Sequence, residues 1–348
     1  MRVLLTGGTG FIGQALARAI RKRGWQLDAL VRRPDSASAR YLATLGAALM
    51  TGDVTQRESM RAAMARVDLL IHNAGVYEFG ANPRLRQRMQ ASNVTGTDNT
   101  LGLALEVGVA RSIYVSSTLA TGATGIEPCD ETYVRRAPCA TEYERTKTDA
   151  HNIALRIRER GLPLIIACPN QVVGPNDHSV FGYLLRMYLL HLLPPLAWDP
   201  EVIQSQVHVR ALAEGIALIA ENGRIGENYL LCGEPTTLRQ LFAFWKPHRG
   251  GFAPKLWLPP ALMKAMFVPL EPLFRLAGLP AIFSRETVKA TVHLNYSSAK
   301  VQRELGWSFP SAADMWPQII ERERRILELR TGVRAKLRPM EAVPSESE

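Results

Sequence analysis

The sequence reads Thr6-Gly7-Gly8-Thr9-Gly10-Phe11-Ile12-Gly13 between an apolar run, residues 2–6, and a segment with helical periodicity. Gly7 permits a tight turn, Gly10 lets a phosphate approach the backbone, and Gly13 lets a helix pack closely against a strand. The amino terminus of that helix presents unpaired N–H groups to an anion. We therefore predict that the loop from Thr6 to Gly13, with Phe11 and Ile12, binds the pyrophosphate of a nicotinamide dinucleotide.

Short apolar runs alternate with helical segments along the first half of the chain, which is typical of a parallel sheet with helices on both faces. The expected strands are residues 2–6, 26–31, 47–50, 68–72, 112–116 and 163–168, with one more at 228–232. We predict an α/β fold built on a Rossmann-type, doubly wound parallel sheet of about seven strands.

The second half of the chain changes in character and suggests a smaller lobe. We expect residues 1–170 to form the dinucleotide-binding domain, with residues 203–233 returning to it, and residues 171–202 and 234–330 to form a mostly helical substrate-binding lobe. Five prolines lie between Leu256 and Phe283 and predict several short helices there rather than one long one. The polar end of the chain, residues 335–348, is expected to be disordered.

Composition narrows the class of protein. The 348 residues are 47% hydrophobic and 21% charged, as in soluble globular proteins, and no apolar run is long enough for a membrane-spanning helix. Four cysteines form no CxxC pair, so neither a disulfide framework nor a metal site is expected, and a reducing cytoplasm is the expected location. The net charge of +10 is dispersed without a recognition motif, which argues against a nucleic-acid partner.

The end of the second expected strand indicates which dinucleotide is bound. An NAD site usually carries an acid there for the adenosine ribose, but this chain has Val31 followed by Arg32. A guanidinium suits a 2′-phosphate, so we predict a preference for NADP(H), with NAD(H) left open. The alternative is that Arg32 stacks on adenine or faces solvent. After the third strand, Asp53 and Val54 are expected beside the adenine, although Asp53 equally fits a turn-capping role.

A second motif points to chemistry. Tyr143 and Lys147 are four residues apart and share one face of an expected helix. A nearby ammonium favours the phenolate, which would lower the pKa of the tyrosine and make it a usable acid or base. Ser116, Ser117 and Thr118 follow an expected strand, at the sheet edge where α/β proteins bind their ligands. A hydroxyl there could hold a substrate oxygen beside the tyrosine.

Together, these motifs resemble the extended short-chain dehydrogenase/reductases of the NAD-dependent epimerase/dehydratase family. The motifs that carry the resemblance are residues 6–13, 72–75, 93–97 and 116–117, the Tyr143 and Lys147 pair, and residues 169–175, 207–209, 296–297 and 304–307. The resemblance implies that Tyr143 is the general acid/base, that Lys147 binds the nicotinamide ribose and lowers the tyrosine pKa, and that Ser117 polarises the substrate oxygen. Ser116 and Thr118 stay open as alternatives to Ser117.

The same resemblance implies further roles. Ala74 and Gly75 would pass close to the cofactor, as would Pro169 and Val172, and Asn93 would support the helix beneath the site. His208 is expected to pack between the lobes rather than to do chemistry. A homodimer is the habit of the family and is expected here by analogy.

Departures from the sugar-modifying members of the family indicate the reaction. No Asp-Glu pair follows Ser117, which argues against dehydration, and Gln171 replaces an asparagine of the sugar-nucleotide epimerases. The apolar second half resembles the dihydroflavonol reductase and 3β-hydroxysteroid dehydrogenase group. We therefore predict an NADP-dependent alcohol/ketone oxidoreductase for a lipophilic or aromatic small molecule. The alternatives are an NAD-dependent sugar or sugar-nucleotide epimerase and a non-catalytic dinucleotide-binding protein. A weak peripheral membrane contact through residues 256–283 also stays open.

Overall fold

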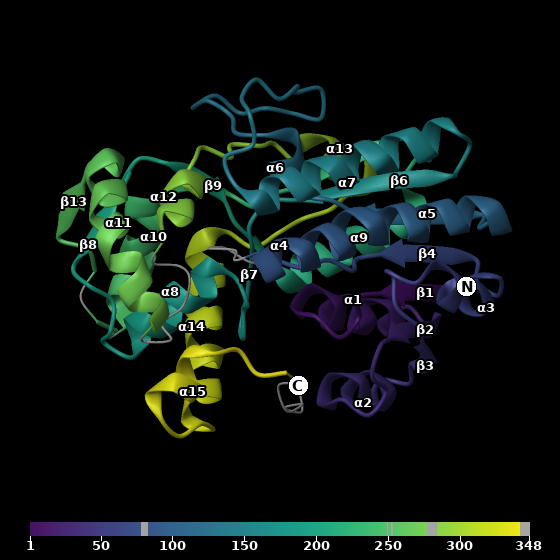
Figure 1. Ribbon diagram of the computed structural model, residues 1–348, viewed down its shortest axis with the longest axis horizontal. Helices are drawn as coiled ribbons and strands as arrows, with labels where there is room; N and C mark the ends of the chain where they lie inside the picture. The colour runs from purple at the N-terminus through teal and green to yellow at the C-terminus, as the bar shows by residue number, and fades with distance from the viewer. Residues whose placement is uncertain (78–82, 249, 252, 277–283, 342–348) are drawn as a thin grey trace.

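The computed structural model describes residues 1–77, 83–248, 250–251, 253–276 and 284–341. Its centre is a seven-stranded sheet in the order β11-β6-β5-β4-β1-β2-β3, with every neighbouring pair parallel (Figure 1). The strands are β1 (Arg2–Thr6), β2 (Gln26–Val31), β3 (Ala48–Thr51), β4 (Leu69–His72), β5 (Arg111–Val115), β6 (Leu164–Pro169) and β11 (Asn228–Leu231). This confirms the predicted Rossmann-type sheet.

Helices cover both faces of the sheet because successive strand residues point to opposite sides. Val3 and Leu5 on β1 join the core with α1 (Phe11–Lys22) and α9 (Val209–Asn222). Leu4, between them, joins the other core with α5 (Gly96–Val107) and α7 (Glu142–Glu159). Strands buried on both faces explain why each appears in the sequence as a continuous apolar run.

Several shorter helices and turns belong to the same part of the structure as the sheet. They are α2 (Ala37–Thr44), a 3₁₀ turn (Arg57–Met60), α3 (Arg61–Met64), α4 (Pro83–Met89), a π-helical stretch (Gln90–Thr95), α6 (Thr118–Thr121) and α13 (Ala299–Leu305). The π-helical stretch continues from α4 directly into α5.

A second group of helices forms the lobe on the left of Figure 1. It contains α8 (Val180–Leu189), α10 (Leu238–Trp245), a 3₁₀ turn (Lys246–His248), α11 (Pro260–Leu276), α12 (Arg285–Ala290), α14 (Ala312–Glu328) and α15 (Val333–Leu337). Three strand pairs join it: β7 (Val172–Val173) with β10 (Val207–His208), β9 (Ile203–Ser205) with β12 (Pro235–Thr237), and β8 (Leu196–Trp198) with β13 (Leu256–Leu258). No helix in the described ranges is long and apolar enough to cross a membrane.

The proline-rich segment differs from the sequence-based expectation. The prediction of several short helices between Leu256 and Phe283 is wrong, because α11 runs unbroken for 17 residues through Pro269 and Pro272. Each proline removes one backbone hydrogen bond. Both prolines lie on the exposed side of α11, where water can satisfy the carbonyls that lose their partners. Residues 277–283 lie outside the described residues.

The end of the chain also differs from the expectation of disorder. Residues 333–337 form α15, and the peptide that follows bonds to the body of the protein. The Asn176 side chain donates to Met340 O (2.9 Å) and accepts from Met340 N (2.7 Å), while Gln14 on α1 donates to Glu341 O (3.0 Å). Residues 335–341 are therefore held in place, and residues 342–348 lie outside the described residues.

Candidate active site

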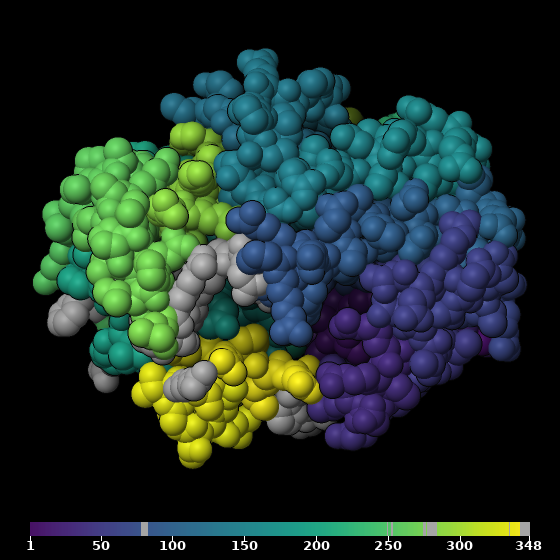
Figure 2. Space-filling view, viewed as in Figure 1, coloured from purple at the N-terminus to yellow at the C-terminus, as the bar shows by residue number. Residues whose placement is uncertain are grey.

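One large cavity, about 970 Å³, lies between the carboxyl edge of the sheet and the lobe. In Figure 2 its mouth is the hollow between the purple and blue segments on the right and the green and yellow segments on the left. The glycine loop after β1 lines one end of the cavity, and apolar residues of α8, α10 and α11 line the other. A dinucleotide and a second molecule can therefore meet inside one enclosed space.

The glycine loop has the backbone form that the sequence predicted. Gly7 has φ +70°, and a side chain there would collide with the Ala74 backbone at 2.7 Å. A side chain at Gly13 would lie 2.1 Å from Gly7 O, so only glycine lets α1 pack this closely. Gly10 has no atom closer than 3.5 Å on its Cβ side, which leaves a cradle in front of the amino terminus of α1. This geometry fits a pyrophosphate.

The predicted loop residues divide into two groups. Gly7, Gly10, Phe11 and Ile12 line the cavity. Thr6 is fully buried instead, and its hydroxyl accepts the backbone N–H groups of Asn73 and Ala74, both at 3.2 Å. Thr6 therefore fixes the turn after β4. Gly13 acts through close packing rather than by facing the cavity.

Arg32 lies at the expected adenosine end of the cavity. Its exposed side chain lines the wall, whereas the neighbouring Arg33 does not. Asp53 and Val54 also line this end. Asp53 Oδ1 accepts bonds from the backbone N–H and the hydroxyl of Thr55, each at 2.9 Å, so the carboxylate caps a turn while bordering the cavity. The two roles considered for Asp53 are compatible.

The three hydroxyls after β5 point to different surroundings. The Ser116 hydroxyl bonds to Nδ1 of His151 (2.8 Å), a residue that does not line the cavity. Thr118 is fully buried, and its hydroxyl has no partner among the described residues. Ser117 caps α6, with its hydroxyl accepting Leu119 N–H at 3.2 Å, and it lines the cavity together with Tyr143. All three residues border the cavity, and Ser117, at 9% exposed, is the least buried of them.

Helix α7 carries a row of polar side chains at every fourth position. Thr141 caps the amino terminus of α7, and Tyr143, Lys147 and His151 then follow one face of the helix. Lys147 Nζ donates to Val115 O (3.2 Å) and to the Tyr114 hydroxyl (3.5 Å), which places it beneath the cavity rather than in its lining. The sequence analysis missed His151, although its spacing from Lys147 is a readable signal.

The pKa values of Tyr143 and Lys147 differ from the expectation that the lysine lowers the pKa of the tyrosine. Burial raises the pKa of the Tyr143 phenol rather than lowering it, because the cavity removes water that would solvate a phenolate. Burial also lowers the pKa of Lys147 to about 8, which weakens its charge near neutral pH. Tyr143 is therefore a protonated phenol at neutral pH in this structure.

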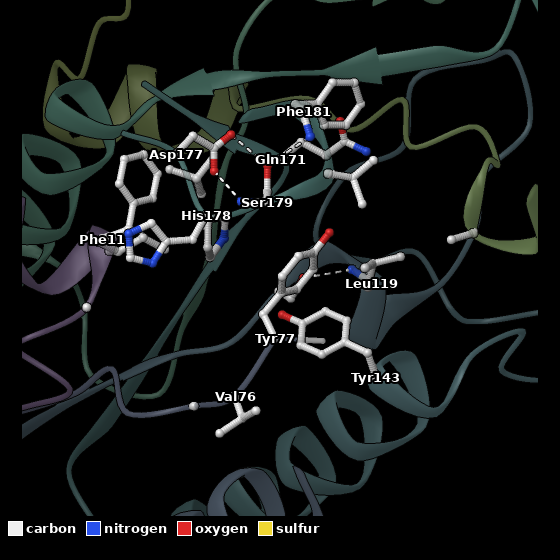
Figure 3. Close-up of a pocket in the computed structure, with 18 of the residues that line it drawn as sticks. Phe11, Val76, Tyr77, Leu119, Tyr143, Gln171, Asp177, His178, Ser179 and Phe181 are labelled. Atoms are coloured by element: carbon white, nitrogen blue, oxygen red, sulfur yellow. Dashed lines mark hydrogen bonds between the residues drawn. The ribbon is translucent and has the colours of Figure 1, made fainter. Parts of the chain in front are cut away.

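Two aromatic rings meet at the centre of the site (Figure 3). The ring of Tyr77 lies edge-on to that of Tyr143, with centroids 4.7 Å apart. The Asn93 side chain bonds both backbone groups of Val76, the residue before Tyr77: it accepts the N–H (2.7 Å) and donates to the carbonyl (3.0 Å). Asn93 also donates to the Thr146 hydroxyl on α7 (3.0 Å). Asn93 thus links this segment to α7, in agreement with its expected supporting role. Tyr77 was not identified from the sequence.

The loop before α8 brings polar groups toward the cofactor end. The His178 ring stacks on Phe11, with centroids 5.9 Å apart (Figure 3). The Asp177 carboxylate accepts hydrogen bonds from the backbone N–H and the hydroxyl of Ser179, each at 2.6 Å. Burial raises the pKa of Asp177 to about 6. His208, in contrast, does not line the cavity; its Nδ1 accepts Arg210 N–H (3.1 Å) and caps α9.

The lobe end of the cavity is mostly apolar, with a few polar residues that include Gln204, Thr287 and Thr291. Pro169 and Val172 border it next to β6, and its wall contains Leu184, Leu193, Leu196, Trp198, Phe242, Met263, Phe267 and Leu294. Gln204 interrupts this wall while being only 2% exposed. Its Nε2 donates to Val292 O (2.6 Å), and its Oε1 has no partner within the described part of the chain. No sequence motif marks Gln204.

The parallel sheet, the glycine cradle and the shared cavity define a Rossmann-type dinucleotide-binding protein with room for a small-molecule substrate. The model of the NAD dependent epimerase/dehydratase family matches residues 3–232. The chain belongs to this family.

Relatives narrow the class of enzyme. Sterol demethylase protein B of Methylococcus capsulatus is 31% identical over 88% of this chain and 93% of its own length. A 3-beta-hydroxysteroid dehydrogenase of Mycolicibacterium neoaurum is 26% identical over 88% of this chain and 86% of its own length. The crystal structure of gox2253 superimposes with a TM-score of 0.78 and 33% identity, covering 93% of this chain and 98% of that one. The chain is an NAD(P)-dependent oxidoreductase of the short-chain dehydrogenase/reductase type.

Proposed function

We propose that this protein is an NADP-dependent reductase that interconverts a ketone or aldehyde and an alcohol on a lipophilic or aromatic molecule. The observation that carries the proposal is the position of Ser117 and Tyr143 in the lining of one cavity, whose two ends are a glycine cradle and an apolar lobe. A reacting carbonyl can reach both hydroxyls only where these two ends meet.

Several residues fit the dinucleotide. Gly7, Gly10, Phe11 and Ile12 would hold the pyrophosphate, Arg32 the 2′-phosphate, Asp53 and Val54 the adenine, and Ala74, Gly75, Pro169, Val172, Tyr143 and Lys147 the nicotinamide end. When bound, the nicotinamide supplies or accepts the hydride. The preference for NADP(H) is supported by Arg32, whose exposed guanidinium lines the cavity beside the end of β2.

Tyr143 would act as the general acid when a carbonyl is reduced. Because burial raises the pKa of its phenol, Tyr143 carries its proton at neutral pH and can donate it to the substrate oxygen as negative charge develops there. Ser117 would hydrogen-bond the same oxygen and fix its position. Lys147, one turn along α7, would orient the cofactor ribose while its charge assists proton return to Tyr143.

The apolar lobe supports a lipophilic substrate. Its wall combines leucine side chains with Trp198, Phe242 and Phe267, and bulky apolar molecules gain free energy by leaving water for such a surface. Relatives named for sterols and hydroxysteroids act on molecules of this type. Gln204 Oε1 adds one hydrogen-bond acceptor, so we expect the preferred substrate to carry a hydroxyl or N–H at a distance from its carbonyl.

A cofactor and substrate screen tests the proposal. The purified protein is titrated with NADPH and NADH by fluorescence, and oxidation of the tighter-binding cofactor is followed with steroid ketones, aromatic ketones and short hydrophilic ketones. We expect tighter binding of NADPH and turnover only with the bulky apolar ketones. Tightly retained NAD with interconversion of sugar nucleotides would instead support an epimerase, and absence of any turnover would support a dinucleotide-binding protein without chemistry.

A further inference from the structure

Helix α11 has an unusual exposed face. Among its described side chains, every one that is well exposed is apolar. These residues are Ala261, Leu262, Ala265, Met266, Val268, Pro269, Pro272, Leu273 and Leu276. The exposed fractions reach 59% for Leu273 and 87% for Leu276. An outward-facing helix surface whose described, well-exposed side chains are all apolar is rarely left in water, and such a patch marks an interaction site.

The opposite face of α11 forms the wall of the cavity. Met263 and Phe267 are buried and line the cavity together with Leu270, and Met266, 36% exposed, lies at the edge between the two faces and also borders the cavity. The two charged residues with described side chains lie at the sides, with Lys264 half-buried and Glu271 paired with Arg285 (3.5 Å). A single helix therefore separates an apolar cavity from an apolar outer surface.

The positive charge of the segments around α11 indicates what kind of partner binds this surface. Residues 246–289 contain seven Lys and Arg and two Glu, a net charge of +5. Lys246, Lys255 and Lys289 are exposed around the helix. An apolar helix face with flanking cations is the pattern that lies in the interface of an anionic bilayer, with apolar side chains among the acyl chains and cations at the headgroups.

We propose that the exposed face of α11, residues Leu262 to Leu276, docks this protein onto the surface of anionic lipid membranes. The helix is 17 residues long, about 25 Å at the α-helical rise, so it can lie flat in the interface without spanning it. Docking in this orientation turns the substrate end of the cavity toward the bilayer, where lipophilic molecules concentrate. The docking itself does not depend on the reaction proposed above.

Flotation with vesicles tests this proposal on the full-length protein. Vesicles of phosphatidylcholine alone are compared with vesicles of equal parts phosphatidylcholine and phosphatidylglycerol. We expect binding to the anionic vesicles, weakened by added salt because exposed charges are screened. The double variant Leu262→Glu/Leu273→Glu should lower the partition coefficient by about tenfold or more, since it places charge at the acyl boundary.

A matched control separates docking from general surface polarity. Ile225 and Val134 are also exposed apolar residues, 53% and 76% exposed, and lie far from α11 in the sequence. The double variant Ile225→Glu/Val134→Glu should bind vesicles as the unchanged protein does. The thermal midpoint of unfolding checks that both variants are folded.

Three results would overturn the proposal. The first is absence of binding to the anionic vesicles, and the second is an equal loss of binding in both double variants. The third is a dimer in sedimentation velocity, without lipid, that Leu262→Glu/Leu273→Glu dissociates, because the face would then be covered by a second copy of the chain.

Discussion

The ring of Tyr77 stands edge-on against the ring of Tyr143, with the ring planes at 83° and the centroids 4.7 Å apart. Tyr77 follows β4 and Tyr143 begins α7, so this contact joins two segments that are 66 residues apart. Both rings line the cavity, as Figure 3 shows, and the Asn93 side chain fixes the backbone of Val76 beside them. The orientation of the Tyr143 phenol therefore depends on a neighbour that no family motif includes.

Removing the Tyr77 ring should leave the Tyr143 phenol in the site but with a less fixed orientation. An edge-to-face pair contributes about 0.5–1.5 kcal/mol. We expect Tyr77→Ala to lower kcat/KM by up to about tenfold, while Tyr77→Phe, which keeps the ring contact, retains most of the activity. Steady-state kinetics of NADPH oxidation measure both variants. Equal losses in Tyr77→Ala and Tyr77→Phe would show that the hydroxyl, and not the ring contact, matters.

Arg32 should decide between the two dinucleotides. A hydrogen bond to a charged group contributes about 1.5–3 kcal/mol, so Arg32→Ala should weaken NADPH binding by about ten- to a hundredfold and leave NADH binding nearly unchanged. Arg33→Ala is the matched control, because Arg33 is exposed but does not line the cavity. Fluorescence titration gives both dissociation constants. If Arg33→Ala has the larger effect, the assignment of the phosphate site to Arg32 fails.

Gln204 should set the preference for a polar group on the substrate. Its unpartnered Oε1 stands in an apolar wall, so Gln204→Leu should raise KM for a ketone that bears a distant hydroxyl by about tenfold and improve or preserve KM for its deoxy analogue. Gln206→Leu is the control, since Gln206 is also buried but does not line the cavity. The same change in KM for both ketones would contradict a role in recognition.

Deprotonation of Lys147 should make kcat/KM fall at alkaline pH. Burial lowers its pKa to about 8, so the ammonium is present below that pH and is lost above it. If the charge orients the cofactor, kcat/KM falls as the pH rises through about 8. The pKa of Lys147 in the folded protein is below its ordinary value of 10.5, so deprotonation favours the folded protein and unfolding does not explain a loss in this window.

A charge-conserving variant checks the origin of this limb. Arginine keeps its charge in proteins at every relevant pH, so Lys147→Arg should retain part of the activity and shift the alkaline limb to higher pH. A pH profile of kcat/KM that is unchanged in Lys147→Arg would assign the limb to another group. Circular dichroism across the same range confirms that the protein stays folded.

The sheet could be predicted from the sequence because its signal is local. Each strand is an apolar run buried on both faces, and every predicted end lies within one residue of the observed end. The glycine cradle is local only in part, since Gly13 is required by contact with Gly7 O in the same turn, whereas Gly7 is required by the distant backbone of Ala74. The prediction for α11 failed because the cost of Pro269 and Pro272 depends on whether the carbonyls they leave unbonded reach water, which depends on the tertiary position of the helix.

The rest of the site depends on contacts between distant residues. Ser116 was indistinguishable from Ser117 in the sequence until the hydroxyl of Ser116 met His151, 35 residues away. The rise in the pKa of Tyr143 follows from the enclosing cavity, which no spacing of residues reveals. Arg186 on α8 pairs with Glu323 on α14 at 3.1 Å, both 1% exposed, and this buried contact joins residues 137 positions apart.

We propose that Tyr143 transfers the proton in a hydride-transfer reaction. The most direct measurement is NADPH oxidation by Tyr143→Phe with the best ketone from the screen, together with NADPH titration of the same variant. We predict a loss of kcat of about a hundredfold or more, with the dissociation constant of NADPH within about threefold of the unchanged protein. Turnover retained at the original rate, with the cofactor still bound, would contradict the account.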